Sequence, residues 1–391
     1  MTDRILVLNA GSSSIKLAIY PADAPPDQPL FKGEADGLGG EQGRLLIRDH
    51  RRNTVIDQRL GASHEEALRA VLRWLAEDSG QDLAAVGHRV VHGGMHYAEP
   101  VRLTPGLVEE LERLDGLAPL HQPHNLSAVR VLARQRPDLP QVACFDTAFH
   151  RTQHWEAQRF ALPREYTAAG ILRYGFHGLS YQHVSSYLAC HHPQLYRGRV
   201  VVAHLGNGAS VCALHHGRSI ATSMGFTALD GLPMGQRCGS LDPGVVLYLM
   251  DHYGMDLRAL EDVLYHRSGL LGMSGISHDM RVLLASDDPA AAEAIRVYCY
   301  RAAREIGALV TTLRGLDGLV FTGGVGQHAA PVREAICERL DWLGVALDQE
   351  RNAGNAGSVS RDGSLPVLVV TCDEERVIAE ETRRIAIGGD A

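Results

Sequence analysis

Lysine is almost missing from this sequence. The 391 residues contain 38 lysines and arginines together, and only Lys16 and Lys32 are lysines, so nearly every cationic side chain is a guanidinium group. Arginine binds flat anions through a rigid fork, whereas lysine carries a compact charge on a flexible stem. Because Lys16 closes a serine-rich turn, we expect a compact cation to be required there.

Long apolar runs and a positive net charge are also missing. No apolar run approaches the roughly 18 residues that a membrane span needs, and the first residues are typical of a strand rather than a signal peptide. The net charge of −8 argues against nucleic acid as the main partner. We therefore expect a cytoplasmic protein of two domains or one large α/β unit, which binds neither nucleic acid nor membrane.

Paired cysteines and two common phosphate-binding motifs are absent too. The seven cysteines are scattered and never arranged as C-x-x-C, which favours reduced thiols over disulfides or structural zinc. The sequence has no G-x-x-x-x-G-K-[ST], and no G-x-G-x-x-G follows the first apolar run. This excludes a Walker-type loop and disfavours a dinucleotide fold, so a nucleotide would need turns of another kind.

Short apolar runs and amphipathic segments alternate in the first part of the chain. Runs rich in β-branched residues predict strands, whereas apolar residues spaced three and four apart predict helices. A three-stranded meander comes first, and helices then alternate with strands, which predicts a mixed sheet covered by helices. The expected strands are 4–8, 15–20, 44–48, 85–91 and 142–145, and the expected helices are 64–79, 104–114 and 124–135.

A strand, a turn of glycine, asparagine and serine, and a second strand occur twice in the chain. Residues 199–214 repeat the order of residues 4–20, and residues 319–326 echo residues 142–147. Two similar domains of this kind would place their strand-end turns along a common cleft, where ligands of α/β sheets usually bind. A final helix is expected over residues 374–387.

Polar turns that follow apolar strands carry the candidate chemistry. In residues 9–16, Gly11 permits a tight turn, serine hydroxyls and backbone N–H groups can donate to phosphoryl oxygens, and Lys16 can neutralise them. Comparable turns occupy residues 146–147, 204–210 and 322–326. The pattern favours a nucleotide held by two hairpin turns.

Two arginines and two carboxylates stand at such positions. Arg89 lies in an apolar strand and Arg237 in a glycine-flanked loop, where each could bind carboxylate or phosphoryl oxygens or form a structural ion pair. Asp146 could act as a base, a nucleophile or a metal-organising group. Glu374 could hold a water of Mg²⁺ or complement the dipole of the final helix.

Motifs spread over the whole chain resemble those of a known family. The sequence is similar to the acetokinase family, the acetate kinases within the superfamily of acetate and sugar kinases, Hsp70 and actin. The resemblance implies an α/β fold of duplicated ribonuclease H-like, actin-like ATPase domains, with mixed sheets, helices and a cleft between them. The motifs are residues 9–16, 88–94, 119–121, 145–150, 173–178, 204–210, 222–226, 234–243, 274–281, 321–326 and 371–375.

The resemblance also implies domain boundaries and a reaction. An N-terminal domain over 1–148 would be joined by the C-terminal helix at about 383–391, and a second domain over 149–382 would bind nucleotide and form a homodimer. The reaction would be reversible, direct in-line phosphoryl transfer from ATP to acetate, giving acetyl phosphate and ADP. Mg²⁺ would be the cofactor, with Mn²⁺ as an alternative ion.

Catalytic residues follow from the same resemblance. Arg89 and Arg237 would bind acetate and stabilise the transferring phosphoryl group, and Asp146 would be the essential carboxylate. His177 would donate a hydrogen bond to the transition state, with support from His121. Positioning and charge stabilisation do most of the work in such a transfer, so no phospho-enzyme is expected.

Metal-binding and nucleotide-binding residues are implied as well. Asn9 and Glu374 would organise the metal ion, and Lys16 would serve the phosphate end of the nucleotide. The remaining nucleotide-binding positions would be His204, Leu205, Gly206, Asn207, Gly208, Asp279, Met280, Arg281, Gly324, Val325, Gly326, Gln327 and His328.

Four positions depart from the family pattern. Gln327 and His328 stand where Glu-Asn is usual, Gln236 replaces a threonine, and Ala228 replaces a proline of the acyl pocket. Losing the proline ring opens room for about one CH₂, which in such a pocket changes selectivity by only ~1–3 kcal/mol, so we expect propionate to be accepted as well. The acyl pocket would be lined by Val91, Leu120, Phe176 and Ala228.

Two other functions stay open at this point. One is a propionate or butyrate kinase of the same fold, although Val91 argues against a much larger pocket. The other is an actin-like or Hsp70-like ATPase without an acyl substrate. Such an ATPase would keep the glycine turns but would have no need of Arg89, Arg237 and an apolar acyl pocket.

Overall fold

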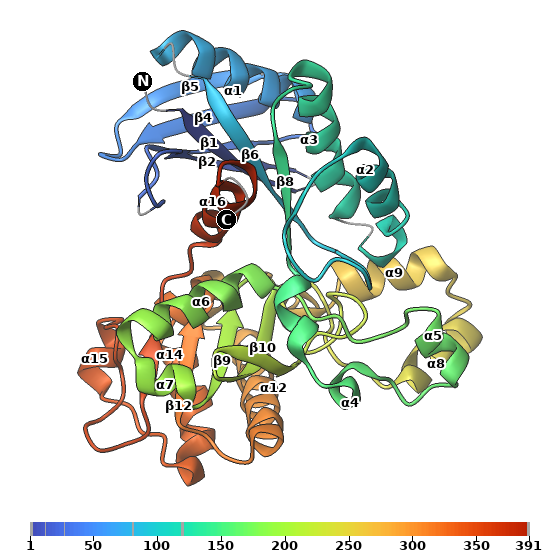
Figure 1. The fold of residues 1–391 in the computed structure, drawn as a ribbon. Helices are drawn as coiled ribbons and strands as arrows, with labels where there is room; N and C mark the ends of the chain where they lie inside the picture. The colour runs from blue at the N-terminus through green and yellow to red at the C-terminus, as the bar shows by residue number, and fades with distance from the viewer. Residues whose placement is uncertain (1–2, 12, 27, 80–81, 119–120, 389–391) are drawn as a thin grey trace. The chain divides into compact units, whose positions relative to one another are not determined.

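The chain forms two compact units. The computed structural model describes residues 3–11, 13–26, 28–79, 82–118 and 121–388. The first unit comprises Met1–Phe149 with Asp373–Ala391, and the second comprises His150–Cys372 (Figure 1). The C-terminal part of the first unit thus begins at Asp373 rather than near residue 383, because the last helix, α16 (Glu374–Ala386), packs along its length against the first sheet.

An eight-stranded mixed sheet forms the centre of the first unit, in the order β5-β4-β3-β2-β1-β6-β8-β7. Strands β1 to β5 pair with one another in antiparallel order, whereas β6 is parallel to both β1 and β8. The strands are β1 (Arg4–Ala10), β2 (Ile15–Pro21), β3 (Phe31–Asp36), β4 (Gly43–Asp49), β5 (Thr54–Leu60), β6 (Leu83–Val90), β7 (Val101–Arg102) and β8 (Gln141–Phe145).

The opening meander therefore has five strands, and the expected three-stranded version is wrong. Strands β3 and β5 escape the sequence pattern because most of their side chains are exposed or half-buried, so neither shows a clear apolar alternation. Gly33, expected in a turn, lies inside β3. A Cβ there would lie 2.8 Å from both Ile47 and the carbonyl oxygen of Leu46, so the close approach of β4 requires glycine.

Helices cover both faces of this sheet. On one face, α1 (His64–Ser79) and α3 (Gln122–Gln135) pack on a core that includes Leu6, Leu8 and Leu17. On the other face, α16 lies across β1, β6 and β8, as Figure 1 shows. The helix approaches so closely that a Cβ on Gly87 would lie 2.6 Å from Ile378. Helices α2 (Pro105–Glu112) and η1 (Asp115–Leu117) precede α3.

The second unit repeats the arrangement with a five-stranded mixed sheet of order β11-β10-β9-β12-β13. Strands β9, β10 and β11 form an antiparallel meander, and β12 is parallel to β9 and β13. The predicted echo of strand, turn and strand is thus present as β9, the turn 206–208 and β10. The strands are β9 (Arg199–Leu205), β10 (Ala209–His215), β11 (Arg218–Thr222), β12 (Gly318–Thr322) and β13 (Val367–Val369).

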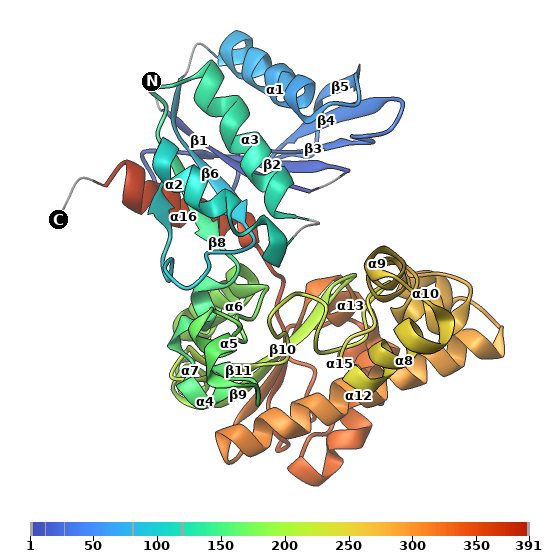
Figure 2. The same cartoon turned by 90° about the vertical axis from the view of Figure 1, so that its right-hand side faces the viewer.

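Helices of the second unit surround this smaller sheet. The long helix α12 packs against β9, β10 and β11, and α10 and α11 pack against α12 (Figure 2). Among the described residues, no helix combines the length and apolar character of a membrane span. The bounds are η2 (Ala148–Thr152), α4 (Trp155–Gln158), α5 (Arg164–Ala168), α6 (Gly178–His191), α7 (Pro193–Arg197), α8 (Pro243–Tyr253), α9 (Leu257–His266), α10 (Gly269–Ser274), α11 (Met280–Leu284), α12 (Pro289–Leu313), α13 (Gly323–His328), α14 (Ala330–Cys337), η3 (Glu338–Leu343) and α15 (Gln349–Ala353).

A buried histidine in β6 makes the stability of the fold depend on pH. His88 Nε2 is 2.8 Å from Gln141 Oε1, and burial lowers the pKa of His88 to about 4. Between the ordinary pKa near 6.5 and this value, the unfolded chain binds a proton that the folded chain does not. Unfolding free energy should therefore fall as pH drops through this window, by up to about 1.4 kcal/mol per pH unit from His88.

Urea denaturation of wild type and His88→Gln at pH 6.5, 5.5 and 4.5 tests this expectation. The variant should lose part of the pH dependence of the free energy of unfolding, because it lacks the buried imidazole. Equal slopes in wild type and His88→Gln would contradict it.

Candidate active site

A bidentate ion pair joins two neighbouring strand ends in the first unit. Arg89 lies in β6 and Asp146 directly follows β8, and these parallel strands present their carboxyl ends at the same edge of the sheet. Arg89 Nε donates to Asp146 Oδ1 at 2.9 Å, and Nη2 donates to Oδ2 at 2.6 Å. Only 2% of Asp146 is exposed. The pair holds a guanidinium group in a fixed orientation at this edge.

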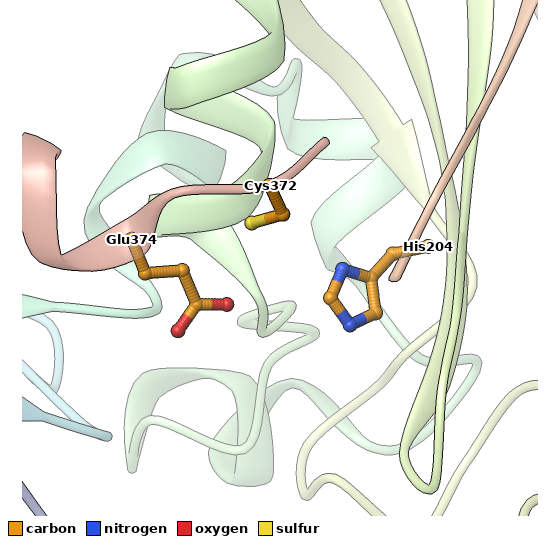
Figure 3. Close-up of side chains that lie close together, drawn as sticks. All are labelled: His204, Cys372 and Glu374. Atoms are coloured by element: carbon orange, nitrogen blue, oxygen red, sulfur yellow. The ribbon is translucent and has the colours of Figure 1, made fainter. Parts of the chain in front are cut away.

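Asn9 and Glu374 lie beside the same guanidinium group. Arg89 Nη1 donates to Asn9 Oδ1 at 3.4 Å and is 3.7 Å from Glu374 Oε2. Asn9 belongs to β1, and Glu374, labelled in Figure 3, is the first residue of α16. Burial raises the pKa of the Glu374 carboxyl, and the charges of Arg89 and Lys16 oppose that shift. Amide and carboxylate oxygens suit a hard divalent cation, so Asn9 and Glu374 could hold one.

Val91 is fixed by a residue that the sequence did not single out. The backbone N–H of Val91 donates to Asn125 Oδ1 at 3.0 Å, and Asn125 Nδ2 donates to the carbonyl oxygen of Ala10 at 2.6 Å. Asn125 thereby ties the end of β6 to the end of β1. His121 is the N-cap residue of the same helix, α3, and Leu120 lies outside the described residues.

Lys16 lies opposite Asn9 in the first sheet, and its charge acts on Glu374. It is exposed on β2, between Asn9 of β1 and Glu34 of β3 in register. Together with Lys32 and with Glu375 of α16, it lines a cavity of about 520 Å³. The lining of this cavity contains neither Arg89 nor Asp146. Both lysines of the chain thus lie at one cavity. Ser12, in the expected phosphate turn, is outside the described residues, and Gly11 N–H closes that turn on the Ser14 carbonyl at 2.8 Å.

In the second unit, His177 and Arg237 meet at a glycine. A Cβ on Gly208 would lie 2.8 Å from Arg237 Nη2 and 3.1 Å from His177 Nε2, so only glycine leaves room for both side chains. Arg237 Nη1 donates to the carbonyl oxygen of Ala228 at 2.6 Å. Ala228, expected to line an acyl pocket with its side chain, therefore also orients the guanidinium group through its backbone.

The histidine at the start of α6 has an unusual backbone. His177 is the N-cap residue of α6 with φ of 59°, in the left-handed region that few residues other than glycine adopt. The preceding carbonyl, Phe176 O, accepts a hydrogen bond from His150 Nε2 at 2.9 Å, and His150 Nδ1 lies 2.9 Å from Ser219 Oγ. No local sequence pattern indicates these supports of the 176–177 backbone, because Ser219 lies 69 residues from His150 in the chain.

A cavity of about 450 Å³ in the second unit collects most of the expected nucleotide-binding residues. Asp279 caps α11 by accepting from Arg281 N at 2.8 Å, and hydrogen bonds from Arg281 lower the pKa of Asp279 to about 2. Leu205 is buried in β9 and, like Gly208, Gly326 and Gln327, does not line this cavity. The lining is Gly206, Asn207, Leu270, His278, Asp279, Met280, Arg281, Leu284, Gly324, Val325, His328 and Ala329.

A fully buried arginine holds the end of α13, one wall of this cavity. Arg333 Nη1 donates to the carbonyl oxygens of Gly326 and Gln327, both at 2.9 Å. Its other N–H groups donate to Asn352 Oδ1, Asn352 O and Asn355 Oδ1 at 2.7–2.8 Å. Gly326 and Gln327 therefore belong to the frame of the cavity. The sequence indicated this loop but not the arginine that supports it.

Residues 4–380 match the sequence model of the Acetokinase family. The chain belongs to this family. It is 51% identical, over 399 aligned residues and the full length of both chains, to an acetate kinase of Rhodopseudomonas palustris.

Solved structures show the same fold. A propionate kinase from Francisella tularensis has a TM-score of 0.92 at 35% identity, covering 98% of this chain and 100% of its own. An acetate kinase from Porphyromonas gingivalis has a TM-score of 0.87 at 35% identity, covering 98% and 99%. The predicted fold class, an α/β chain with two mixed, helix-covered sheets, is confirmed.

Proposed function

We propose that this member of the acetokinase family is an ATP-dependent acetate kinase, which reversibly forms acetyl phosphate and ADP from acetate and ATP. The observation that carries the proposal is a pair of oriented guanidinium groups. Arg89 is fixed by Asp146, and Arg237 lies with His177 at Gly208. Transfer of a phosphoryl group to a carboxylate calls for donors to both anions, and these side chains supply them.

The chemical step needs little beyond positioning. A carboxylate oxygen of acetate attacks the γ-phosphorus, the new O–P bond forms, and the bond to the leaving oxygen of ADP breaks in line with it. Acetate is already an anion near neutral pH, so no base is required, and Asp146 serves by orienting Arg89 towards the acceptor. Arg237 and His177 donate to phosphoryl oxygens as charge spreads over them.

A divalent cation accompanies the nucleotide in this proposal. Asn9 and Glu374 would hold Mg²⁺, for which Mn²⁺ could substitute, because their oxygens are hard ligands. Such an ion neutralises charge on the phosphate oxygens when bound. Lys16, whose charge already acts on Glu374, would serve the phosphate end of the nucleotide. The cavity of about 450 Å³ in the second unit, with Asn207, Met280 and His328, would hold the adenosine end.

The acyl group sets the choice between acetate and its longer homologues. Val91, Leu120, Phe176 and Ala228 are the proposed contacts of the methyl group. Val91 and Phe176 are buried apolar side chains. The small side chain of Ala228, where the family pattern has a proline ring, would leave room for about one further methylene. The similarity to a propionate kinase structure supports propionate as a second substrate.

Trapping of acyl phosphate with hydroxylamine tests the function and the selectivity together. With ATP and Mg²⁺, kcat/KM should be highest for acetate and within about tenfold of that value for propionate. It should fall by about tenfold or more again for butyrate, because each additional methylene changes the transition-state free energy by about 1–3 kcal/mol. ATP hydrolysis that does not depend on an added carboxylic acid would favour the ATPase alternative. A kcat/KM for butyrate equal to that for acetate would contradict the proposed pocket.

The same proposal includes a homodimer formed through the second unit. Leu247, Tyr248 and Tyr253 of α8 and Leu257 of α9 are each more than half exposed. Apolar side chains gathered in this way usually mark an interface.

The seven cysteines are all free thiols, which supports the proposal of a cytoplasmic location.

A further inference from the structure

One carboxylate closes the loop that carries Ala228 and Arg237. This loop, residues 223–242, joins β11 to α8 in the second unit, and we refer to it as the β11–α8 loop. Asp230 Oδ1 accepts hydrogen bonds from Ser240 Oγ and from the backbone N–H of the next residue, 231, both at 2.8 Å. The part of the loop that contains Arg237 therefore begins and ends beside Asp230.

The other oxygen of this carboxylate binds an arginine. Arg173 Nη1 donates to Asp230 Oδ2 and to the carbonyl oxygen of Ser223, both at 3.0 Å. Because Ser223 directly follows β11, this guanidinium group ties the beginning of the loop to Asp230. The guanidinium carbon also lies 5.2 Å from the centre of the Phe160 ring, close enough for a cation–π contact. Both oxygens of Asp230 thus join separate parts of the chain.

A glycine makes room for Asp230 inside the loop. A Cβ on Gly225 would lie 2.5 Å from Asp230 Oδ2, so a side chain at this position would push the carboxylate away. The carbonyl oxygen of Gly225 accepts from the backbone N–H groups of Tyr174 at 3.0 Å and Gly175 at 3.3 Å. These two residues directly precede Phe176. The loop is therefore bonded, close to Asp230, to the segment that enters α6.

Short stretches of chain connect Asp230 and its partner Ser240 to the two residues of proposed function. Ala228 lies two positions before Asp230, and Arg237 lies three positions before Ser240. Arg237 Nη1 also donates to the Ala228 carbonyl oxygen at 2.6 Å, and its own carbonyl accepts from Met234 N–H at 3.0 Å. Each residue has only two soft dihedral angles, so such short spacers transmit a displacement of Asp230 to both residues.

We propose that Asp230 is a positioning residue, which holds Arg237 and Ala228 in place and so sets both the rate of transfer and the choice of acyl group. The inference rests on the proposed kinase function, and Asp230 acts through these two residues rather than on the substrates. A displacement of about 1 Å in a group that stabilises a transition state can cost about 10²-fold in rate. A displaced Ala228 also changes the fit of a longer acyl group.

Hydrogen–deuterium exchange read by mass spectrometry tests the tether without any substrate. Asp230→Ala should speed amide exchange at least about tenfold in peptides covering residues 225–240, because the loop loses its closing contacts. We expect the variant to stay folded, since the charge of Arg173 also acts on the carboxyl of Glu305 and keeps a counter-charge there. Exchange equal to that of wild type overturns the proposal.

Asp317→Ala is the matched control for both measurements. Asp317 is also a partly exposed carboxylate that binds an arginine, Arg199, and a backbone N–H group, but it directly precedes β12. This variant should leave the exchange of residues 225–240 and the acyl selectivity unchanged. Equal effects of Asp317→Ala and Asp230→Ala would show a general loss of stability and overturn the proposal.

Kinetics with two acceptors separate positioning from folding. Asp230→Ala should lower kcat/KM for acetate about 10- to 100-fold and change the ratio of kcat/KM for propionate to that for acetate at least about threefold. Asp230→Asn keeps one acceptor oxygen and should restore part of both quantities. Ser240→Ala removes a single donor and should change the ratio in the same direction, which keeps the test usable if Asp230→Ala does not fold. An unchanged ratio in the folded variants overturns the proposal.

The two measurements distinguish this inference from the proposed function. If wild type forms no acyl phosphate, the proposed function fails, and exchange alone decides whether Asp230 holds the loop. If wild type is active and Asp230→Ala keeps wild-type kinetics, the proposed function stands and the positioning role of Asp230 is overturned.

Discussion

Replacing Arg89 with lysine is expected to reduce kcat/KM for acetate by about 10²- to 10³-fold while the chain stays folded. Lysine keeps the positive charge beside Asp146, Asn9 and Glu374 but cannot form the two parallel bonds that Asp146 now accepts. The acceptor would lose an oriented donor, and the transition state would lose more than the ground state. Acyl hydroxamate formation gives the rate, and thermal unfolding checks the fold.

Replacing Arg89 with alanine should cost activity and stability together. It leaves the carboxylate of Asp146, only 2% exposed, without its partner, and breaking a buried pair in this way commonly costs about 3–5 kcal/mol. The matched control is Arg44→Ala, which removes an equally bidentate but exposed partner of Asp57 and should change neither quantity measurably. Wild-type activity in Arg89→Lys would refute the assigned role.

Replacing Arg333 with methionine is expected to lower the free energy of unfolding by at least about 3 kcal/mol. The change keeps an unbranched chain in the space but removes donors to five acceptor atoms, two of which are the Gly326 and Gln327 carbonyls at the end of α13. Buried carbonyls without donors are costly, and α13 would loosen. We also expect KM for ATP to rise at least about tenfold more than KM for acetate.

Denaturation in urea and a two-substrate kinetic series measure these effects. Arg351→Met is the control, because Arg351 bonds Asp362 and the Ser360 carbonyl at a half-exposed position and should cost less than about 1 kcal/mol. A stable Arg333→Met protein with unchanged KM for ATP would show that Arg333 does not support the nucleotide cavity.

The sequence predicted the elements whose apolar spacing is strong. The helix over 64–79 agrees with α1, and the final helix agrees with α16 to within a residue. The exposed strands β3 and β5 carry too few apolar side chains to be recognised, and the two-residue strand β7 is too short. These elements are specified by pairing with a neighbour rather than by their own pattern.

The candidate site divides in a similar way. Residues such as Arg89 and Asp146 stand at strand ends, where a local pattern with a family resemblance could indicate them. The structure brings these two residues together in a bidentate ion pair. Supporting residues such as Asn125 and Ser219 could not be found in this way, since their partners lie up to 115 residues away in the chain. Only the folded sheet brings such residues into contact.

The scarcity of lysine gives this enzyme a chemical handle. Its two side-chain amines line a single cavity beside the start of α16, and all other cationic side chains are guanidinium groups, which do not react with common amine reagents. A fluorophore, crosslinker or solid support attached through lysine would therefore be placed on one face of the first unit. Side-chain amine labelling, which is random on most proteins, is therefore directional on this one, whereas the α-amine is the other group that such reagents modify.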